Sequence, residues 1–220
     1  PDAIWQRLNW AWGAFFGISR LYDYTFPVRG AFEGGETIFP SATLRGGWSL
    51  GGSVARNFFT FAPAAYAAHT VETTRPAAPP TPPFPLDTVP FLVPGPERGV
   101  FSGSLRVTTP TYRIFTLSAS LALGETVIFS EAAPGRNVRI GATLDLRPSS
   151  ALRVAFQVNR LRITRARDGS QFSDEVIPRL KLEYQLTRAI FFRFVGQYTA
   201  RERDALYDGN GDPILVNNVL

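Results

Sequence analysis

The side chains of this chain that could do chemistry are charged residues set singly into segments of alternating apolar and polar residues. Glu183 would group with Lys181 and Arg193, and Asp145 with Arg153, if these segments pair as neighbouring strands. Catalysis by paired carboxylates needs two acids at one place, and each group has only one. The groups predict either a salt-bridge ladder that stiffens a wall or a lining that favours anionic or sugar-like solutes. The residues predicted for this lining are Arg106, Arg139, Asp145, Arg153, Arg179, Lys181, Glu183 and Arg193.

The only histidine, His69, is the one residue that a Ser–His or Asp–His hydrolase could use. It lies in AAYAAHTVETT, and no nucleophile motif is nearby. A loop histidine is therefore the favoured interpretation, no catalytic residue is predicted, and the chain is not expected to be an enzyme.

The segment DGNGDP suggests a calcium loop through Asp208, Asn210 and Asp212. The EF-hand pattern needs Gly at its sixth position and Glu at its twelfth, where this chain has Pro213 and Val219. A Gly-rich turn is favoured, with a weak calcium site as the alternative. No resident metal or other cofactor is expected.

Composition limits the fold to an all-β chain. A length of 220 residues suits one β domain, and 19 Gly and 18 Pro accompany the absence of any long amphipathic helix. The lack of Cys excludes disulfides and thiolate metal sites. No run of 18 apolar residues could cross a bilayer as a helix. Because Met is absent even at position 1, the chain is expected to begin inside a longer reading frame or to be a processed product.

The net charge of +5 comes almost wholly from arginine, since Lys181 is the only lysine. A nucleic-acid binder would gather this charge in a patch or run. The arginines are instead spread singly over the polar positions of the alternating segments. No nucleic-acid partner is expected.

Alternation with a period of two predicts strands that have one apolar and one polar face. Leu180, Leu182 and Tyr184, for example, alternate with Lys181 and Glu183. The predicted strands are 4–18, 41–57, 99–109, 112–123, 136–147, 151–165, 176–186 and 190–203. Residues 19–40 alternate again in part, and either a ninth strand or an extension of the first remains open there.

Matching residues in kind across neighbouring strands predicts the register of three hairpins. The predicted pairs are Leu186–Ile190 with Tyr184–Phe192, Leu182–Phe194 and Glu183–Arg193; Leu146–Leu152 with Leu144–Val154 and Asp145–Arg153; and Val107–Phe115 with Leu105–Leu117 and Ser104–Ser118. Apolar residues then face each other, and opposite charges meet on the polar side.

The predicted connections alternate between short turns and long loops. Those near 109–111, 148–150 and 187–189 are short, and those at 58–98, 124–135, 166–175 and from 204 onward are long. Turns should therefore gather at one end of the sheet and loops at the other. The stretch 75–98 contains nine prolines, which predicts a polyproline-like or disordered segment within an extracellular loop at 58–98.

One strand breaks its own alternation. In 151–165, Val154 and Val158 face one way, whereas Leu161 and Ile163 face the other. A bulge near residues 159–160 would explain the change. The alternative is that the strand leaves the membrane there, so that the alternation no longer applies.

Four features favour lipid over a second sheet as the neighbour of the apolar face. The strands are long, their apolar face is rich in aromatic residues, their polar face carries charges at mid-strand, and short turns alternate with long loops. The aromatic residues expected to face lipid are Trp10, Trp12, Trp48, Phe192, Phe194 and Tyr198. In lipid, only a closed barrel satisfies the backbone of every strand.

The segments RVTTPTYRIF, LRPSSALRV and RDGSQFSDEVIPRLKLEYQLTRAIFFRFVGQYTARERDAL resemble a family of large bacterial outer-membrane proteins. In that family, a family-nine-like carbohydrate-binding domain precedes a β-barrel of unknown function. The resemblance is dense over residues 147–206 and looser elsewhere. It implies an outer-membrane location in a Gram-negative-type bacterium and carries over no catalytic residue.

The chain departs from this family at both ends. No carbohydrate-binding domain precedes Pro1, and the terminal ILVNNVL lacks the final aromatic strand of a complete barrel. The chain is therefore expected to be a segment of one barrel whose closing strands are missing.

The prediction is an antiparallel meander of about eight strands that forms part of a transmembrane β-barrel in the bacterial outer membrane. Its expected role is a non-enzymatic pore, receptor or surface platform, with lipid as partner and a saccharide or small anion as solute. The alternative is a soluble, secreted β-sandwich that binds polysaccharide through Trp5, Trp10, Trp12 and Trp48.

Overall fold

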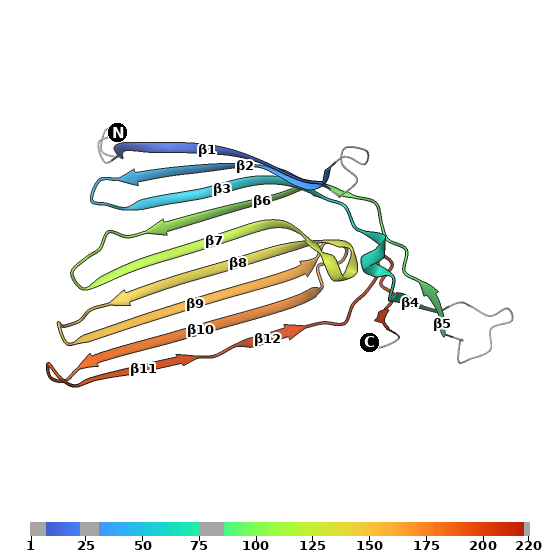
Figure 1. Ribbon diagram of the computed structural model, residues 1–220. Coiled ribbons are helices and arrows are strands. Elements are labelled where there is room, and N and C mark those ends of the chain that lie inside the picture. Colours follow the sequence, from blue (N-terminus) through green and yellow to red (C-terminus); the bar gives the residue numbers. More distant parts are fainter. Residues whose placement is uncertain (1–7, 23–30, 75–85, 218–220) are drawn as a thin grey trace.

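The main body of the molecule is one antiparallel sheet. The computed structural model describes residues 8–22, 31–74 and 86–217, together with the side chains of most of them. Ten strands form the sheet in the order β1-β2-β3-β6-β7-β8-β9-β10-β11, with β12 also beside β10 (Figure 1). The strands are β1 (Leu8–Tyr22), β2 (Ala31–Leu44), β3 (Ser49–Phe59), β6 (Glu97–Thr108), β7 (Phe115–Ile128), β8 (Ala133–Leu146), β9 (Leu152–Arg165), β10 (Gln171–Gln185), β11 (Phe191–Gln197) and β12 (Ala200–Arg203). The expected all-β antiparallel meander is confirmed.

The two ends of the sheet differ. Turns 45–48, 109–114, 147–151 and 186–190 lie together at one end, here called the turn end (Figure 1). At the other, the loop end, a small sheet forms in the order β13-β4-β5 beside two 3₁₀ turns. Its elements are β4 (His69–Thr74), β5 (Leu86–Pro90), β13 (Ile214–Val216), η2 (Pro63–Tyr66) and η3 (Phe129–Glu131). Within the described ranges, no helix is long and apolar enough to cross a bilayer.

The edges of the main sheet are β1 on one side and β11 with β12 on the other. Over the described residues, no ladder joins β1 to β11 or β12. The backbone groups on the outer side of these strands therefore lack sheet partners in the structure.

The register gives the sheet an apolar face and a polar face. One row of paired residues crosses the sheet as Trp12, Ala42, Leu50, Val107, Ala119, Ala142, Val158 and Pro178. The adjacent row runs Thr43, Ser49, Thr108, Ser118, Thr143, Gln157, Arg179 and Gln197. Since neighbours along a strand point to opposite sides, the first row marks the apolar face and the second marks the polar face.

The hydrophobic core lies only at the loop end. Phe61, Tyr66, Val100, Val127 and Ala132 form one buried cluster there. The Tyr66 hydroxyl donates to the Phe129 carbonyl at 2.6 Å, and burial raises the pKa of Tyr66. In the described parts of the chain, the middle of the sheet contributes no apolar side chain to a buried core. The sheet body is therefore a single layer with both faces open.

The interval 19–40 holds a ninth long strand. Residues 31–44 form β2, which pairs with β1 and β3, so the predicted strand 41–57 was wrong. The segment consists instead of the end of β2, a turn, and β3. Gly46 and Gly47 both have positive φ, and Leu44 N–H donates to the Trp48 carbonyl at 2.8 Å. A residue with a Cβ would be strained at these positive φ angles, so the two glycines allow the chain to turn here.

Of the three predicted hairpin registers, one is confirmed. Strands β10 and β11 pair Glu183 with Arg193 and Tyr184 with Phe192 as expected. The other two registers were wrong by an even number of residues, so each side chain keeps its predicted face. The observed pairs are Leu146–Val154 with Asp145–Ala155, and Val107–Ala119 with Leu105–Leu121.

Turn chemistry explains both wrong registers. Ser149 Oγ accepts from the N–H groups of Ala151 and Leu152, which widens the turn between β8 and β9. In the turn between β6 and β7, Thr109 Oγ1 accepts from Leu117 N–H, and Pro110 has no N–H to donate. Side-chain hydrogen bonds in these turns thus take the place of the backbone hydrogen bonds that a tighter hairpin would have made.

The loops are shorter than predicted because the strands run further. β7 and β8 extend until only 129–132 separates them, and 166–170 alone joins β9 to β10. Part of 75–98 is also regular, since β5 pairs with β4 and β6 begins at Glu97. The segment was therefore wrongly predicted to lack structure throughout, while residues 75–85 lie outside the described ranges.

β9 contains no bulge where one was predicted. Its pairing with β8 and β10 runs without a shift through Asn159 and Arg160. Leu161 and Ile163 therefore turn toward the polar side without any break in register. The predicted bulge was wrong, and the change of side chains belongs to the loop end of the sheet.

The predicted eighth strand is split by a proline. β11 and β12 share one register against β10, and the gap between them faces Pro178. Tyr198 N–H donates to the Pro178 carbonyl at 3.0 Å. The return bond is missing because proline has no N–H.

A buried ion pair connects the elements of the loop end. Arg165 and Glu131 have side chains that are 3% and 1% exposed, with Nη2 and Oε1 2.7 Å apart. Arg165 also donates to the carboxylate of Asp204 and to the carbonyls of Gln171 and Ala205. Its guanidinium therefore joins η3, the β9–β10 connection and the segment after β12.

We expect Glu131→Gln to lower the free energy of unfolding by about 3–5 kcal/mol, because it leaves the Arg165 charge buried without its partner. The measurement is denaturant unfolding of the purified protein. The double variant Glu131→Gln/Arg165→Met should lose less than the sum of the two single losses. Additive losses would show that the two side chains act separately.

Candidate functional site

The polar face brings together the eight charged residues predicted to form a lining. By register, Arg106, Arg139, Asp145, Arg153, Arg179, Lys181, Glu183 and Arg193 all share the face that carries Ser118 and Thr143. They come from β6, β8, β9, β10 and β11. The face therefore combines charges with short hydroxyl side chains rather than with packed apolar groups.

Two acids organise the charges near the turn end. Asp145 accepts from Arg153 Nε at 3.0 Å and from Arg147 Nε at 3.1 Å. Glu183 Oε1 lies 2.7 Å from Lys181 Nζ and 3.6 Å from Arg193 Nε. Each acid thus serves two cations, which matches the ladder expected from the sequence. The Asp145–Arg153 contact forms although the two residues are diagonal neighbours rather than the predicted direct pair.

Three arginines of the polar face have no acidic partner. Within the described ranges, Arg106, Arg139 and Arg179 take part in no ion pair, while their neighbours in the rows are mostly Ser, Thr, Asn, Gln, Gly and Ala. With six cations against two acids in the set of eight, the face has an excess of positive charge. Its chemistry suits hydrogen-bonding, negatively charged groups.

The surroundings of Arg106 are small and hydroxylated. Ser53 and Ser104 hydroxyls are 2.7 Å apart, and those of Thr108 and Ser118 are 3.2 Å apart. A Cβ at Gly141 would lie 2.7 Å from Ser120 Oγ, so glycine leaves room at that position. Short side chains leave open space above the sheet in which long arginines can move.

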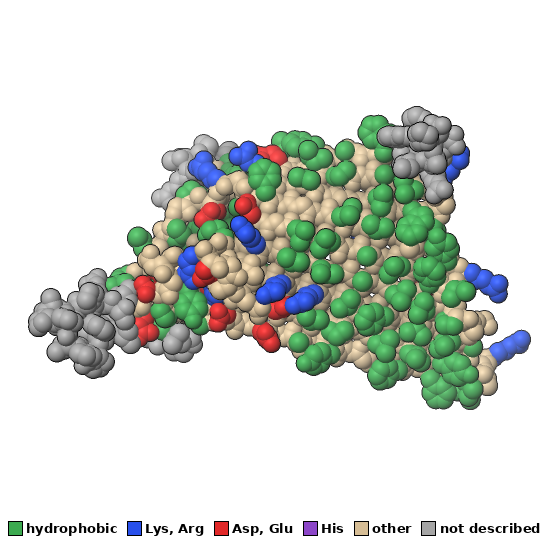
Figure 2. Space-filling model, turned by 180° about the vertical axis from the view of Figure 1, so that it is seen from behind, with side chains coloured by type: hydrophobic (Ala, Val, Ile, Leu, Met, Phe, Trp, Pro, Cys, Tyr) green, Lys and Arg blue, Asp and Glu red, His purple; other side chains and the backbone are tan. Residues whose placement is uncertain are grey.

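The apolar face carries most of the predicted aromatic residues. Trp12, Phe192 and Phe194 lie on it and are 76%, 57% and 59% exposed. Trp48 lies in the turn between β2 and β3, and Tyr198 lies in the gap between β11 and β12. The side chain of Trp10 and the whole of Trp5 lie outside the described residues. Figure 2 shows the broad apolar field that these residues share with aliphatic side chains.

Charged residues end the apolar face toward the loop end. The charged boundary consists of Arg20, Glu36, Arg56, Glu125, Arg136, Arg160, Arg162 and Asp174, all in register with the apolar positions of their strands. Arg20 pairs with Glu36, and Arg160 Nη2 lies 2.6 Å from Asp174 Oδ2. Blue and red side chains mark this limit in Figure 2. These residues were not predicted to form a group, although each one is a charged residue at an apolar position of its strand.

The charged boundary follows one row over most of the sheet. Glu36 pairs with Arg56, and Glu125 pairs with Arg136, in the same row from β2 to β8. On β9 the charge begins nearer the turn end, at Arg160 opposite Ile140, and on β10 it begins at Asp174, opposite Arg162. The apolar band therefore has a nearly straight limit from β2 to β8 and a step at β9.

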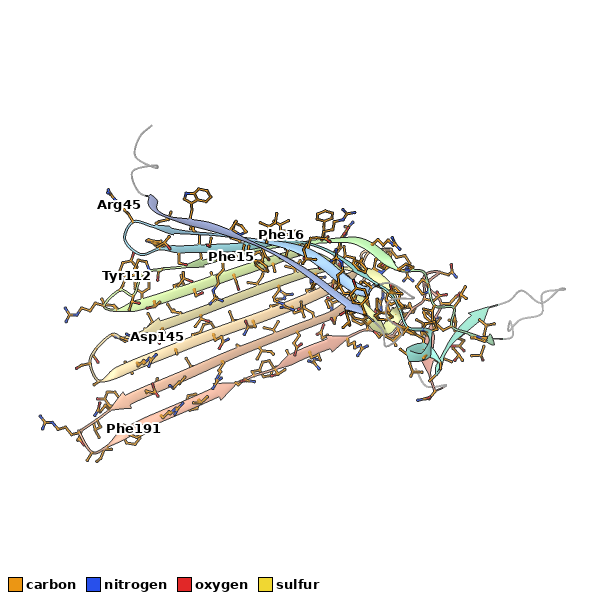
Figure 3. All side chains as sticks on the ribbon, turned by 45° about the horizontal axis from the view of Figure 1, so that its top comes forward. Phe15, Phe16, Arg45, Tyr112, Asp145 and Phe191 are labelled. Atoms are coloured by element: carbon orange, nitrogen blue, oxygen red, sulfur yellow. The ribbon has the colours of Figure 1, made fainter. Side chains whose placement is uncertain are left out.

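The edges of the sheet depart from the simple two-faced pattern. Phe15 pairs with Phe39 on the polar side of β1 and β2, and Phe191 and Val195 take the same side of β11. Phe15 and Phe16 point to opposite sides of β1 in Figure 3. Phe15 and Phe191 are 74% and 68% exposed. The sequence signal, two consecutive aromatic residues, was present at both edges but was not used.

His69 begins β4, so it is not a loop residue as predicted. Its ring lies 5.2 Å from that of Tyr66 and 6.0 Å from that of Phe91. Within the described ranges, Nδ1 is buried and has no hydrogen-bond partner. The immediate ring neighbours are aromatic, and no arrangement of nucleophile and base is formed by these contacts.

The carboxylate of Asp208 closes a turn. It accepts from the N–H groups of Asn210 and Asp212, at 2.8 and 2.9 Å. Over the part of the chain that the structure describes, no three His, Asp or Glu side chains are grouped to hold a metal ion. The segment has the geometry of the Gly-rich turn that the sequence favoured over calcium.

No protein-family model matches the chain, and neither a curated protein nor a solved structure matches it.

The ladder and lining interpretations of the polar face differ in the energy of the Asp145–Arg153 pair. Both side chains are partly exposed, so a double-mutant cycle should give a coupling of about 0.2–1 kcal/mol. Asp145→Asn, Arg153→Gln and the double variant would be compared by chemical unfolding. A coupling well above this range would assign the pair a mainly structural role in the wall.

Proposed function

We propose that the sheet forms part of the wall of a bacterial outer-membrane β-barrel without enzymatic activity. Its apolar face would contact lipid, and its polar face would line an aqueous space that favours anionic solutes. The single observation that carries the proposal is the apolar band, which has no protein cover in the described structure and ends at a charged boundary. The resemblance of residues 147–206 to an outer-membrane family supports the same location.

The dimensions of the band agree with a bilayer. On β7, apolar positions run from Phe115 to Leu123 before Glu125. These eight residue steps cover about 26 Å along the strand at about 3.3 Å each. A tilt of about 40° reduces the height to about 20 Å, close to the band of about 25 Å found in outer-membrane barrels.

In a membrane, the open edges of the sheet would need partners. In hydrocarbon, the unpaired N–H and C=O groups of an edge strand would each cost several kcal/mol. The outer sides of β1 and β11 would therefore have to pair with further strands. A closed barrel in which further strands join these two edges satisfies this condition.

The polar face would select solutes by charge. Arg106, Arg139 and Arg179 have no acidic partner in the described structure, and no acid is paired with them in the neighbouring strands. A ring of arginines attracts anions and repels cations at close range. Sugar-like solutes with acidic groups would fit the same hydrogen-bonding surface.

Substituted-cysteine labelling tests the assignment of the two faces, and residues 1–220 contain no Cys that would add to the signal. In the full-length protein in vesicles, Cys at Ser118 and Thr143 should react with a charged, water-soluble maleimide. Cys at Leu117 and Leu144 should react only with a lipid-soluble reagent, because the faces alternate.

Labelling in detergent-free solution serves as the comparison. If the protein is monomeric and soluble without detergent and all four positions react with the charged reagent, the barrel proposal is wrong. Shielding of Leu117 and Leu144 by protein in that soluble form would instead support a β-sandwich.

Charge removal tests the solute preference. Arg106→Gln/Arg139→Gln/Arg179→Gln should lower the ratio of anion to cation permeability in planar bilayers, because it removes three positive charges from the polar face. Arg136→Gln/Arg162→Gln/Arg98→Gln, which removes three charges near the loop end, is the matched control. An unchanged ratio in the first variant would contradict a lining role while leaving the membrane location intact.

A further inference from the structure

The turns at the turn end carry arginines and no acidic residues. Each of its four turns contains one arginine and no acid: Arg45, Arg113, Arg147 and Arg188. All four side chains are exposed. In the turn half of the described sheet, the acids are Asp145 and Glu183 alone, and both already hold cations of the polar face.

Three of these arginines are free to bind a ligand. Arg147 donates to Asp145 at 3.1 Å, but Arg45, Arg113 and Arg188 make no hydrogen bond or ion pair within the described structure. Arginine presents a planar, permanently charged fork that binds phosphate oxygens in a bidentate manner. Removing these side chains should not disturb the fold.

Aromatic side chains lie beside the arginines. The rings of Tyr112 and Phe115 are 4.9 Å apart, and Tyr112 and Phe191 are 40% and 68% exposed. In Figure 3, Arg45 and Tyr112 lie in different turns of the turn end, and Phe191 lies at the same end, at the start of the edge strand β11. Aromatic rings with adjacent cations are typical of the level where lipid headgroups meet the acyl chains.

A hollow between two turns, bordered by the polar-face residues Arg153 and Glu183, could seat one headgroup phosphate at the rim of the wall. It has a volume of about 490 Å³ and lies between turns 147–151 and 186–190. Arg147, Arg153 and Arg188 contribute three cations to its lining, against the single acid Glu183. Glu183 is held by Lys181 at 2.7 Å, so the hollow retains an excess of positive charge.

The loop end has the opposite character. There the charged boundary mixes acids with arginines, as in the Arg160–Asp174 and Arg20–Glu36 pairs. Positive charge without acids is thus confined to the turn end. Charge complementarity points to an anionic surface at that end alone.

We propose that the turn end docks on the headgroups of anionic phospholipids, with one lipid phosphate seated in the hollow between Arg147 and Arg188. The inference rests on the proposed membrane location and goes beyond it, since it assigns the leaflet that the turns meet. Each arginine near an anionic surface should strengthen binding about fivefold, and salt should weaken the effect.

Vesicle flotation with the full-length protein tests the proposal. Arg45→Gln/Arg113→Gln/Arg188→Gln should reduce binding to phosphatidylglycerol-containing vesicles by on the order of 100-fold, and binding to pure phosphatidylcholine vesicles little. Arg98→Gln/Arg136→Gln/Arg162→Gln changes the net charge equally and should leave the preference for phosphatidylglycerol unchanged. Arg188→Gln alone should have a larger effect than Arg45→Gln alone, because only Arg188 lines the hollow.

Three results would overturn the proposal. Equal losses in both triple variants would show that net charge alone matters. Equal losses in the two single variants would remove the hollow as a seat. Displacement from the vesicles by inorganic phosphate, but not by chloride at the same ionic strength, would show a free-anion site. By contrast, a wild-type protein that binds neither kind of vesicle would contradict the proposed membrane location itself.

Discussion

The structure depends on what covers the apolar face of its single-layer sheet. The large apolar side chains that are exposed on this face are Trp12, Phe16, Ile18, Ile38, Val54, Phe101, Leu105, Leu117, Leu121, Leu123, Val138, Ile140, Phe156, Leu180, Tyr184, Phe192 and Phe194. At about 1 kcal/mol for each half-exposed residue, an apolar cover on this face would contribute on the order of 20 kcal/mol that the sheet alone does not gain. This exceeds the roughly 5–15 kcal/mol by which domains are stable. Under the proposed function, lipid provides this cover.

In the described structure, apolar side chains are buried at the loop end but not along the strands. At the loop end, η2, η3 and the small sheet build a conventional interior around Tyr66 and Val127, and the Arg165–Glu131 pair joins its elements. Along the strands, no protein layer performs this task in the described structure. The change in side-chain facing at Leu161 and Ile163 marks the transition. Strands that continue past the charged boundary turn their apolar residues from the outer surface toward the protein interior.

The two faces of the sheet could be predicted from the sequence, but not every register between its strands. Alternation is a local property, so Leu117 and Ser118 could be assigned to opposite faces directly. The pairing of Leu146 with Val154 depends on the hydroxyl of Ser149, which captures two backbone N–H groups. The two glycines after Arg45 were ambiguous for a similar reason, since glycine suits both a strand and a turn. The Arg165–Glu131 pair joins residues 34 positions apart, and no local pattern signals it.

The exposed edge at β11 constrains how the sheet can continue. Phe192 and Phe194 belong to the uncovered apolar face, so a strand that paired with this edge would need apolar residues opposite them. Phe191 and Val195 add a second condition, because they present apolar surface on the polar side of that edge. Such a strand would need apolar residues on both faces there, or another segment would have to cover the space above it. The edge at β11 would therefore pair only with a strand whose apolar residues match its own, whereas a flat, evenly polar edge could pair with almost any strand.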